Sequence, residues 1–296
     1  MAVERECLLS GDDLYVADVS CQDPPRGWTE VRPAPVFGLV MVRRGMFRGR
    51  IDGVEQVLDP ACVYVERIGA EQQFDHPCGG DRYTELVLSE PRTAELLGGD
   101  PEVPQGLVFT TPRMAVAHRL LTARARDGAD SFELAERALA LAGEVLSALA
   151  PARVTSGRPV RDAARHRLVE AARAALAADP GLGLERLGQA AGCSPYHLSR
   201  IFRAATGEGI AAYRNRLRVT LALERLTEGE TRLALLAQEL GFSDQAHLTR
   251  VVHRTAGLPP GRLRTLLGPA AGAAPATRAA PATRAAPASG ATRERA

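Results

Sequence analysis

The spacing of apolar residues changes along the 296-residue chain, and each change predicts a different architecture. Between about residues 28 and 110, short apolar runs such as VFGLVMV, CVYVERI and YTELVLS alternate with turns rich in glycine, aspartate and proline. Short apolar runs bounded by turn residues are typical of the strands of a small antiparallel barrel or sandwich. The N-terminal half is therefore predicted to be mostly β-structure.

After Pro112 the apolar residues recur at helical spacing. One helix is predicted over about 113–126 and a second over about 132–149, where Asp130 and Glu133 are placed as a capping pair. The second helix presents one apolar face, made of Leu134, Ala138, Leu141, Val145 and Ala148. This face either packs on the strands of its own domain or pairs with a second copy of the chain in a dimer, and the pattern favours neither.

Composition divides the rest of the chain. Residues 1–150 form the predicted N-terminal domain, and the segment 151–159 (PARVTSGRP) has the small and turn-forming residues of a linker. Helical spacing then continues over 160–267, which predicts an all-α second domain. Residues 268–296 repeat AAPATR and contain no large apolar side chain, so this tail is predicted to be disordered.

The segment 184–264 contains an internal repeat. At an offset of 49 residues the matching pairs are Leu187 and Leu236, Gln189 and Gln238, Gly192 and Gly241, and Ser194 and Ser243. One extra residue after Ser243 changes the offset to 50, and the later pairs are Leu198 and Leu248, Ser199 and Thr249, Arg200 and Arg250, Gly207 and Gly257, and Arg214 and Arg264. Agreement at this many positions indicates a duplicated structural unit.

Each repeat has the parts of a helix-turn-helix. Gly192 and Gly241 supply a residue that tolerates positive φ between two short helices. Ser194 and Ser243 are placed to cap the second helix, and Pro195 suits its first turn. The sequence predicts second helices at 195–205 and 244–255, joined by one long helix over the segment IAAYRNRLRVTLALERL.

The second helix of each unit has an apolar face and an exposed polar stripe. In the first unit the apolar residues are Leu198, Ile201, Phe202 and Ala205, and the stripe is Tyr196, Ser199, Arg200 and Arg203. In the second unit the stripe is Ala246, Thr249, Arg250 and His253, flanked by Gln245 and His247. An arginine in the middle of such a helix can reach O6 and N7 of guanine. A single stripe is more simply explained as a solvated helix face, but its recurrence behind the same turn favours DNA binding.

Charge supports a nucleic-acid partner. Residues 1–157 hold 16 arginines and 24 acidic residues (net −8), whereas residues 158–267 hold 17 and 10 (net +7), and the tail adds +3. A basic second half suits contact with phosphate, with chance fluctuation as the alternative. The sequence shows neither an apolar run long enough to cross a membrane nor a secretory signal, so we expect a cytoplasmic protein.

Residues 184–264 resemble the DNA-binding domain of AraC/XylS-type transcriptional regulators. The resemblance rests on the Gly241-Phe242-Ser243 turn and on Gly257, Pro260 and Arg264. It implies that bases are contacted by Tyr196, Ser199, Arg200, Gln245, Ala246, His247 and Arg250, and the DNA backbone by Arg203, Arg218 and Thr249. Departures from the family pattern are Leu248 and Val252 in place of Phe, His253 in place of a basic residue, and Leu263 in place of Tyr.

The same resemblance implies partners and an N-terminal fold. The first domain is expected to be a cupin-like barrel that binds a small-molecule effector and carries dimer-forming helices. The protein is then expected to be a homodimer that binds operator DNA, regulates transcription and contacts RNA polymerase. If the helical domain instead mediates only protein contacts, salt-dependent DNA binding is absent.

Residues with catalytic or metal-binding chemistry are few in the N-terminal half. His76 and His118 are its only histidines and form no HxH pair, so neither an enzyme, a cofactor nor a metal site is expected. The cysteines Cys7, Cys21, Cys62 and Cys78 lack the close pairs of a zinc site, and with Cys193 their odd number argues against a disulfide framework. Cys78, beside His76 and Asp81 in HPCGGD, is a candidate redox thiol; the alternative is a turn with an incidental cysteine.

Overall fold

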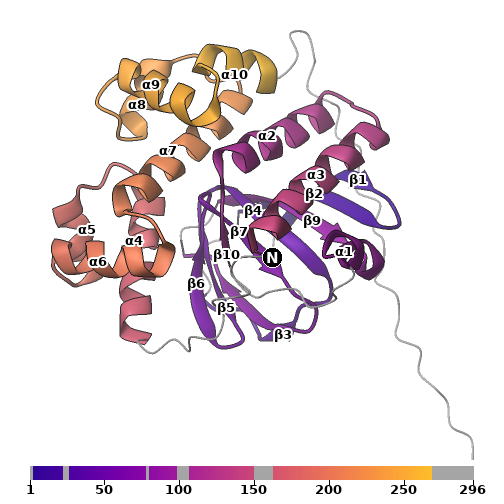
Figure 1. Cartoon of the computed structure of the whole chain (residues 1–296), viewed down its shortest axis with the longest axis horizontal. Coiled ribbons are helices and arrows are strands. Elements are labelled where there is room, and N and C mark those ends of the chain that lie inside the picture. The colour runs from indigo at the N-terminus through magenta and orange to yellow at the C-terminus, as the bar shows by residue number, and fades with distance from the viewer. Residues whose placement is uncertain (1–2, 23–26, 78–79, 99–106, 150–162, 269–296) are drawn as a thin grey trace, which may run out of the picture.

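The computed structural model describes residues 3–22, 27–77, 80–98, 107–149 and 163–268. The predicted linker at 151–159, the tail beyond Gly268 and Cys78 lie outside these ranges. The described chain has a strand-rich N-terminal part and an all-helical C-terminal part (Figure 1), which confirms the expected fold class. None of its described helices is both long enough and apolar enough to cross a membrane.

The described strands form two antiparallel sheets. The six-stranded sheet has the order β1 (Val3–Ser10), β2 (Leu14–Cys21), β9 (Asp81–Leu88), β4 (Phe37–Arg44), β7 (Cys62–Glu66) and β10 (Leu107–Phe109). The four-stranded sheet has the order β3 (Arg32–Pro33), β8 (Glu71–Asp75), β5 (Phe47–Ile51) and β6 (Val54–Leu58). The sequence prediction began its strand region near residue 28 and missed β1 and β2.

The six-stranded sheet is covered on both faces. On one face, Val42 and Tyr64 pack against Phe47 and Leu58 of the smaller sheet. On the other face lie α2 (Pro112–Arg126) and α3 (Ser131–Leu149), while α1 (Glu90–Leu96) follows β9. Because strand β4 is buried on both sides, it is an almost continuous apolar run rather than an alternating one.

Helix α3 packs on its own strands. Its face of Leu134, Ala138, Leu141 and Val145 is buried against the sheet, whereas Ala148 is exposed, contrary to expectation. The carboxylate of Asp130 accepts a hydrogen bond from the backbone N–H of Glu133 at 2.8 Å, in agreement with the predicted cap. Of the two interpretations of this face, packing on the strands is the one that the structure displays.

The C-terminal part has two units joined by one helix. The first unit is α4 (Ala163–Ala178), α5 (Leu184–Ala191) and α6 (Pro195–Thr206). The second unit is α8 (Leu233–Glu239), α9 (Gln245–Ala256) and α10 (Pro260–Leu267). Helix α7 (Ile210–Thr227) connects them, with Tyr213 and Leu217 in the core of the first unit and Leu223 and Leu226 in the core of the second (Figure 1).

Candidate nucleic-acid interface

The turn glycines have the backbone conformation that the repeat predicts. Gly192 has φ 76° at the end of α5, and Gly241 has φ 72° directly after α8. A Cβ atom on Gly241 would lie 2.5 Å from Cα of Gly181, which is closer than real Cβ contacts. Gly241 is therefore required both for its positive φ and for a close approach of two backbone segments.

The second helices of the two units, α6 and α9, are capped by different residues. The Ser194 hydroxyl accepts a hydrogen bond from the backbone N–H of His197 at 3.3 Å, as predicted. In the second unit the cap is Asp244 rather than Ser243, and its carboxylate accepts from the backbone N–H of His247 at 2.7 Å. The extra residue after Ser243 moves the cap by one position. The hydrogen bond from His247 lowers the pKa of Asp244, and a negative charge suits a helix N-terminus.

Helix α6 exposes the polar stripe expected for the first unit. Tyr196 is 82% exposed, and Ser199, Arg200 and Arg203 are also exposed. The opposite face buries Leu198, Ile201 and Phe202, although Ala205, expected on that face, is exposed. Among the described residues, Arg200 and Arg203 form no ion pair. The side chains of this stripe therefore face solvent, where a partner can reach them.

Helix α9 exposes a smaller set. Gln245, Ala246 and Arg250 are exposed, while His247 and Thr249 are half-buried. The ring of His247 lies edge-on to Phe242 at 5.3 Å, and its Nδ1 atom is 3.4 Å from the backbone nitrogen of Ser243. Nδ1 also lies 3.1 Å from the Ser243 hydroxyl, so this nitrogen is engaged within the turn.

Arg218 does not lie on this surface. It is 4% exposed, its Nε donates to the carbonyl of Pro180 at 2.8 Å, and its guanidinium lies 5.4 Å from the ring centre of Phe242. Burial, followed by the neighbouring Arg214, lowers its pKa to about 10. We therefore correct the expectation of a DNA-backbone contact: Arg218 tethers the segment before α5 to the second unit.

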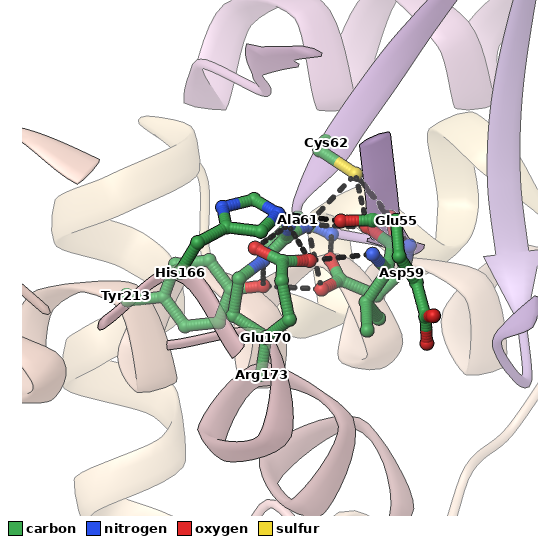
Figure 2. Close-up of polar contacts among 9 residues, drawn as sticks. Glu55, Asp59, Ala61, Cys62, His166, Glu170, Arg173 and Tyr213 are labelled. Atoms are coloured by element: carbon green, nitrogen blue, oxygen red, sulfur yellow. Dashed lines mark hydrogen bonds and ion pairs between the residues drawn. The ribbon is translucent and has the colours of Figure 1, made fainter. Parts of the chain in front are cut away.

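A buried polar network holds the first unit on the strand-rich part (Figure 2). The guanidinium of Arg173 in α4 donates to the Val57 carbonyl at 2.7 Å, to Asp59 at 3.2 Å and to Glu170 at 2.9 Å. Its Nε donates to the Tyr213 hydroxyl at 3.1 Å, and that hydroxyl donates to Asp59. No member of this network has a buried side-chain nitrogen or oxygen without a partner among the described residues.

The network also fixes the charge states of its members. Although burial opposes a charge on Arg173, Tyr213, Asp59 and Glu170 together raise its pKa. Burial, reinforced by Asp59, raises the pKa of the Cys62 thiol to about 12, so this cysteine stays protonated near neutral pH. The site is a structural contact between the two parts of the chain, with no reactive thiolate.

The second unit is held differently. Ala115 of α2 belongs to the apolar core of this unit, and α2 contacts α7 and α10. Beside it, Glu224 of α7 lies 2.7 Å from Nε of Arg119 and 3.6 Å from Nη1 of Arg43. Both carboxylate oxygens of Glu224 nevertheless lack a hydrogen-bond partner among the described residues. The charged groups of these ion pairs are therefore poorly aligned for hydrogen bonding.

Comparison with known proteins identifies the class of the helical part. Residues 187–265 match the family described as "Helix-turn-helix domain". Over 83 residues the chain is 31% identical to the multiple antibiotic resistance protein MarA of Salmonella typhimurium, covering 28% of this chain and 65% of MarA. Over 78 residues it is 35% identical to a putative AraC-like transcription regulator of Streptomyces lividans, covering 26% of each chain.

These matches place residues 187–265 among helix-turn-helix domains. Within that class, the segment is similar to parts of MarA and of a putative AraC-like transcription regulator. The matched segment spans 65% of MarA and 26% of the Streptomyces regulator. The similarity to these relatives therefore concerns the helix-turn-helix segment alone. Among solved structures, the chain resembles ToxT of Vibrio cholerae, with 10% identity, a TM-score of 0.35, and coverage of 86% of this chain and 99% of ToxT.

Proposed function

We propose that this protein is a sequence-specific regulator of transcription that binds double-stranded DNA through α6 and α9. The observation that carries the proposal is the duplicated helix-turn-helix, in which Arg200 and Arg250 occupy equivalent exposed positions within a segment of net charge +7. The relatives MarA and the Streptomyces regulator share this segment. With α7 as a rigid connector, we expect the two helices to enter successive major grooves, about 34 Å apart.

The roles proposed for individual side chains rest on the family resemblance, and their exposure supports them. Tyr196, Ser199 and Arg200 of α6, and Gln245, His247 and Arg250 of α9, are proposed to contact bases, and Ala246 offers a methyl contact. Arg203 and Thr249 are proposed to contact phosphates, which sets register without reading sequence. Arg218 is left out of this set because it is buried.

The remaining parts of the proposal concern the whole chain. We take residues 1–150 as a sensor and dimerisation domain, 160–267 as the DNA-binding domain, and 268–296 as a tail. A small-molecule effector bound by the first domain is proposed to change the contacts made by α2 and α4. We propose a cytoplasmic homodimer, without enzyme activity, that acts on RNA polymerase.

Binding measurements on the two equivalent arginines test the proposal. An operator is first selected from random duplexes and matched to genome-wide binding sites. Arg200→Ala and Arg250→Ala are each expected to cost about 1–3 kcal/mol at that operator and to relax specificity at one base, because each loses a bidentate contact with guanine.

Fluorescence anisotropy at fixed salt gives the affinities. The control is Arg32→Ala, since Arg32 is also exposed but lies on the small sheet, where it pairs with Glu30. If both helix variants keep wild-type affinity, α6 and α9 do not read DNA. If the wild-type chain shows no salt-dependent binding to any duplex, the protein-contact alternative for this domain is correct.

A further inference from the structure

A cluster of three potential ligands lies in the strand-rich part, where β2 ends and β9 begins. Cys21 is the last residue of β2 and Asp81 is the first residue of β9, and the two are direct partners in the antiparallel register. Directly opposed residues project from the same face of a sheet, with Cβ atoms about 4.5–5.5 Å apart. His76 follows the last residue of β8. Its ring nitrogen, the Cys21 sulfur and an Asp81 oxygen all lie within 4.8 Å of one another.

The carboxylate of Asp81 is buried, and only one of its two oxygens has a hydrogen-bond partner among the described residues. The residue is 1% exposed, and its Oδ2 atom lies 2.6 Å from Nδ1 of His76. Its Oδ1 atom has no hydrogen-bond partner among the described residues. A buried carboxylate oxygen is costly when it has no donor or cation beside it. A bound cation at this point supplies the missing partner.

The neighbours of the cluster hold its ligands in place. The ring of Phe47 stacks on His76, with centres 5.1 Å apart and an angle of 25° between the planes. A Cβ atom on Gly45 would lie 3.0 Å from Cα of Asp81, so the backbone is closely packed there. Cys21 is 2% exposed, whereas the His76 side chain is 19% exposed. Of the three side chains, His76 is therefore the one that solvent reaches most readily.

The chemical nature of the three side chains indicates which metal ion they can bind. We propose that Cys21, His76 and Asp81 form a binding site for one divalent ion of the zinc type. Thiolate, imidazole and carboxylate are the protein ligands that zinc takes, and a thiolate disfavours magnesium and calcium. Three protein ligands leave the fourth tetrahedral position to water.

Binding requires small movements and the loss of one proton. Zinc bonds of about 2.0–2.3 Å place tetrahedral ligands about 3.3–3.7 Å apart, so Nδ1 of His76 and Oδ2 of Asp81, now 2.6 Å apart, must separate if both bind the ion. The Cys21 thiol releases its proton to solvent as the sulfur binds the ion. No electron is transferred in this step.

Cobalt and zinc titrations of the full-length chain test the site. The protein is stripped with a chelator under reducing conditions and titrated with Co²⁺, which reports a sulfur ligand through a thiolate-to-metal charge-transfer band. The band is expected to saturate at one equivalent, and Zn²⁺ is expected to abolish it. Zinc affinity is then measured by competition with a chromogenic chelator.

Substitutions of the three residues test whether each one binds the ion. Cys21→Ser is expected to remove the band, and His76→Gln and Asp81→Asn are expected to weaken zinc binding by at least about tenfold. Cys7→Ser is the matched control, because Cys7 is an exposed thiol on β1, the neighbouring strand. Since Cys21 and Asp81 are buried, circular dichroism checks that each variant is folded, and the more exposed His76→Gln keeps the test decisive. The proposal is overturned if the wild-type chain gives no band, or if band and affinity persist in Cys21→Ser and His76→Gln.

Discussion

The two helix-turn-helix units share one scaffold but differ in what they expose and in how they are held. In the first unit, α6 presents Tyr196, Ser199 and Arg200, and its contact with the strand-rich part is a fully hydrogen-bonded network around Arg173. In the second unit, α9 presents Ala246 beside Arg250, and its contact combines an apolar face of α2 with poorly aligned ion pairs.

This difference has a direct consequence for any change of arrangement between the two parts. The first contact would expose a set of buried, mutually satisfied polar groups if it opened, and the loss of any one member leaves the others unpaired. The second contact already contains buried oxygens of Glu224 that lack a hydrogen-bond partner among the described residues. We therefore expect the second unit to separate from the strand-rich part more readily than the first.

The largest loss of stability is expected from a substitution that breaks the contact between the first unit and the strand-rich part. Arg173→Ala is expected to lower the free energy of unfolding by about 3–5 kcal/mol, because Asp59 stays fully buried, and Glu170 partly buried, without their cation. Arg119→Ala is expected to cost less, about 1–3 kcal/mol, since Arg43 still lies 3.6 Å from Glu224. Urea unfolding followed by circular dichroism measures both.

An exposed arginine provides the control for these two substitutions. Arg186 lies on the exposed surface of α5, so Arg186→Ala should change stability by no more than about 0.5 kcal/mol. Equal losses in Arg173→Ala and Arg119→Ala would contradict the difference between the two contacts. A loss below about 1 kcal/mol in Arg173→Ala would mean that the network contributes little to stability.

Much of the helical part could be predicted from the sequence because its signals are local. A glycine, a cap and an apolar spacing specify each turn within about a dozen residues, and they recur at a constant offset. The strands β1 and β2 were missed for opposite reasons. Most residues of β1 are exposed, and Glu4, Arg5 and Glu6 are charged, whereas β2 has buried residues on both faces, so neither shows a simple alternation.

The exposed stripes could be predicted, but the roles of buried charges could not. Arg218 sits in α7 between other arginines, and its burial depends on Pro180 and Phe242, which come from distant segments. The contact between Asp59 and Arg173 joins residues 114 positions apart, and no local pattern marks it. Likewise, no HxH motif or cysteine pair marks the cluster of Cys21, His76 and Asp81, because its members come from β2, from the residue after β8 and from β9.

A smaller effect on stability is expected from the two helix caps, whose contributions should depend differently on pH. Ser194→Ala should cost about 1 kcal/mol, and this cost should not change with pH because a hydroxyl does not titrate in this range. Asp244→Ala should also destabilise the chain, but in a pH-dependent way. The pKa of Asp244 is lowered from 3.8 in the folded chain, so its contribution is present above that pH and is lost as the pH falls through the folded value.

Thermal or urea unfolding from about pH 7 down to the lowest pH at which the wild-type chain stays folded measures this response. The difference in stability between wild type and Asp244→Ala should shrink toward the acid end, and the difference for Ser194→Ala should stay constant. Asp244→Asn is the control, since it keeps a capping oxygen without the charge. A gap that does not shrink would mean that the carboxylate charge contributes nothing to the cap.

The smallest expected effect distinguishes an exposed arginine from a buried one on the same domain. Arg203→Ala should weaken binding to all duplexes about equally and reduce the slope of log K against log salt by about 1, because one phosphate contact is lost. Arg218→Ala should leave this slope unchanged, since its guanidinium is taken up by Pro180 and Phe242. Anisotropy titrations at several salt concentrations, on operator and unrelated duplexes, measure both slopes. If the slope changes with Arg218→Ala and not with Arg203→Ala, the DNA backbone runs across a different face of the first unit than the one α6 presents.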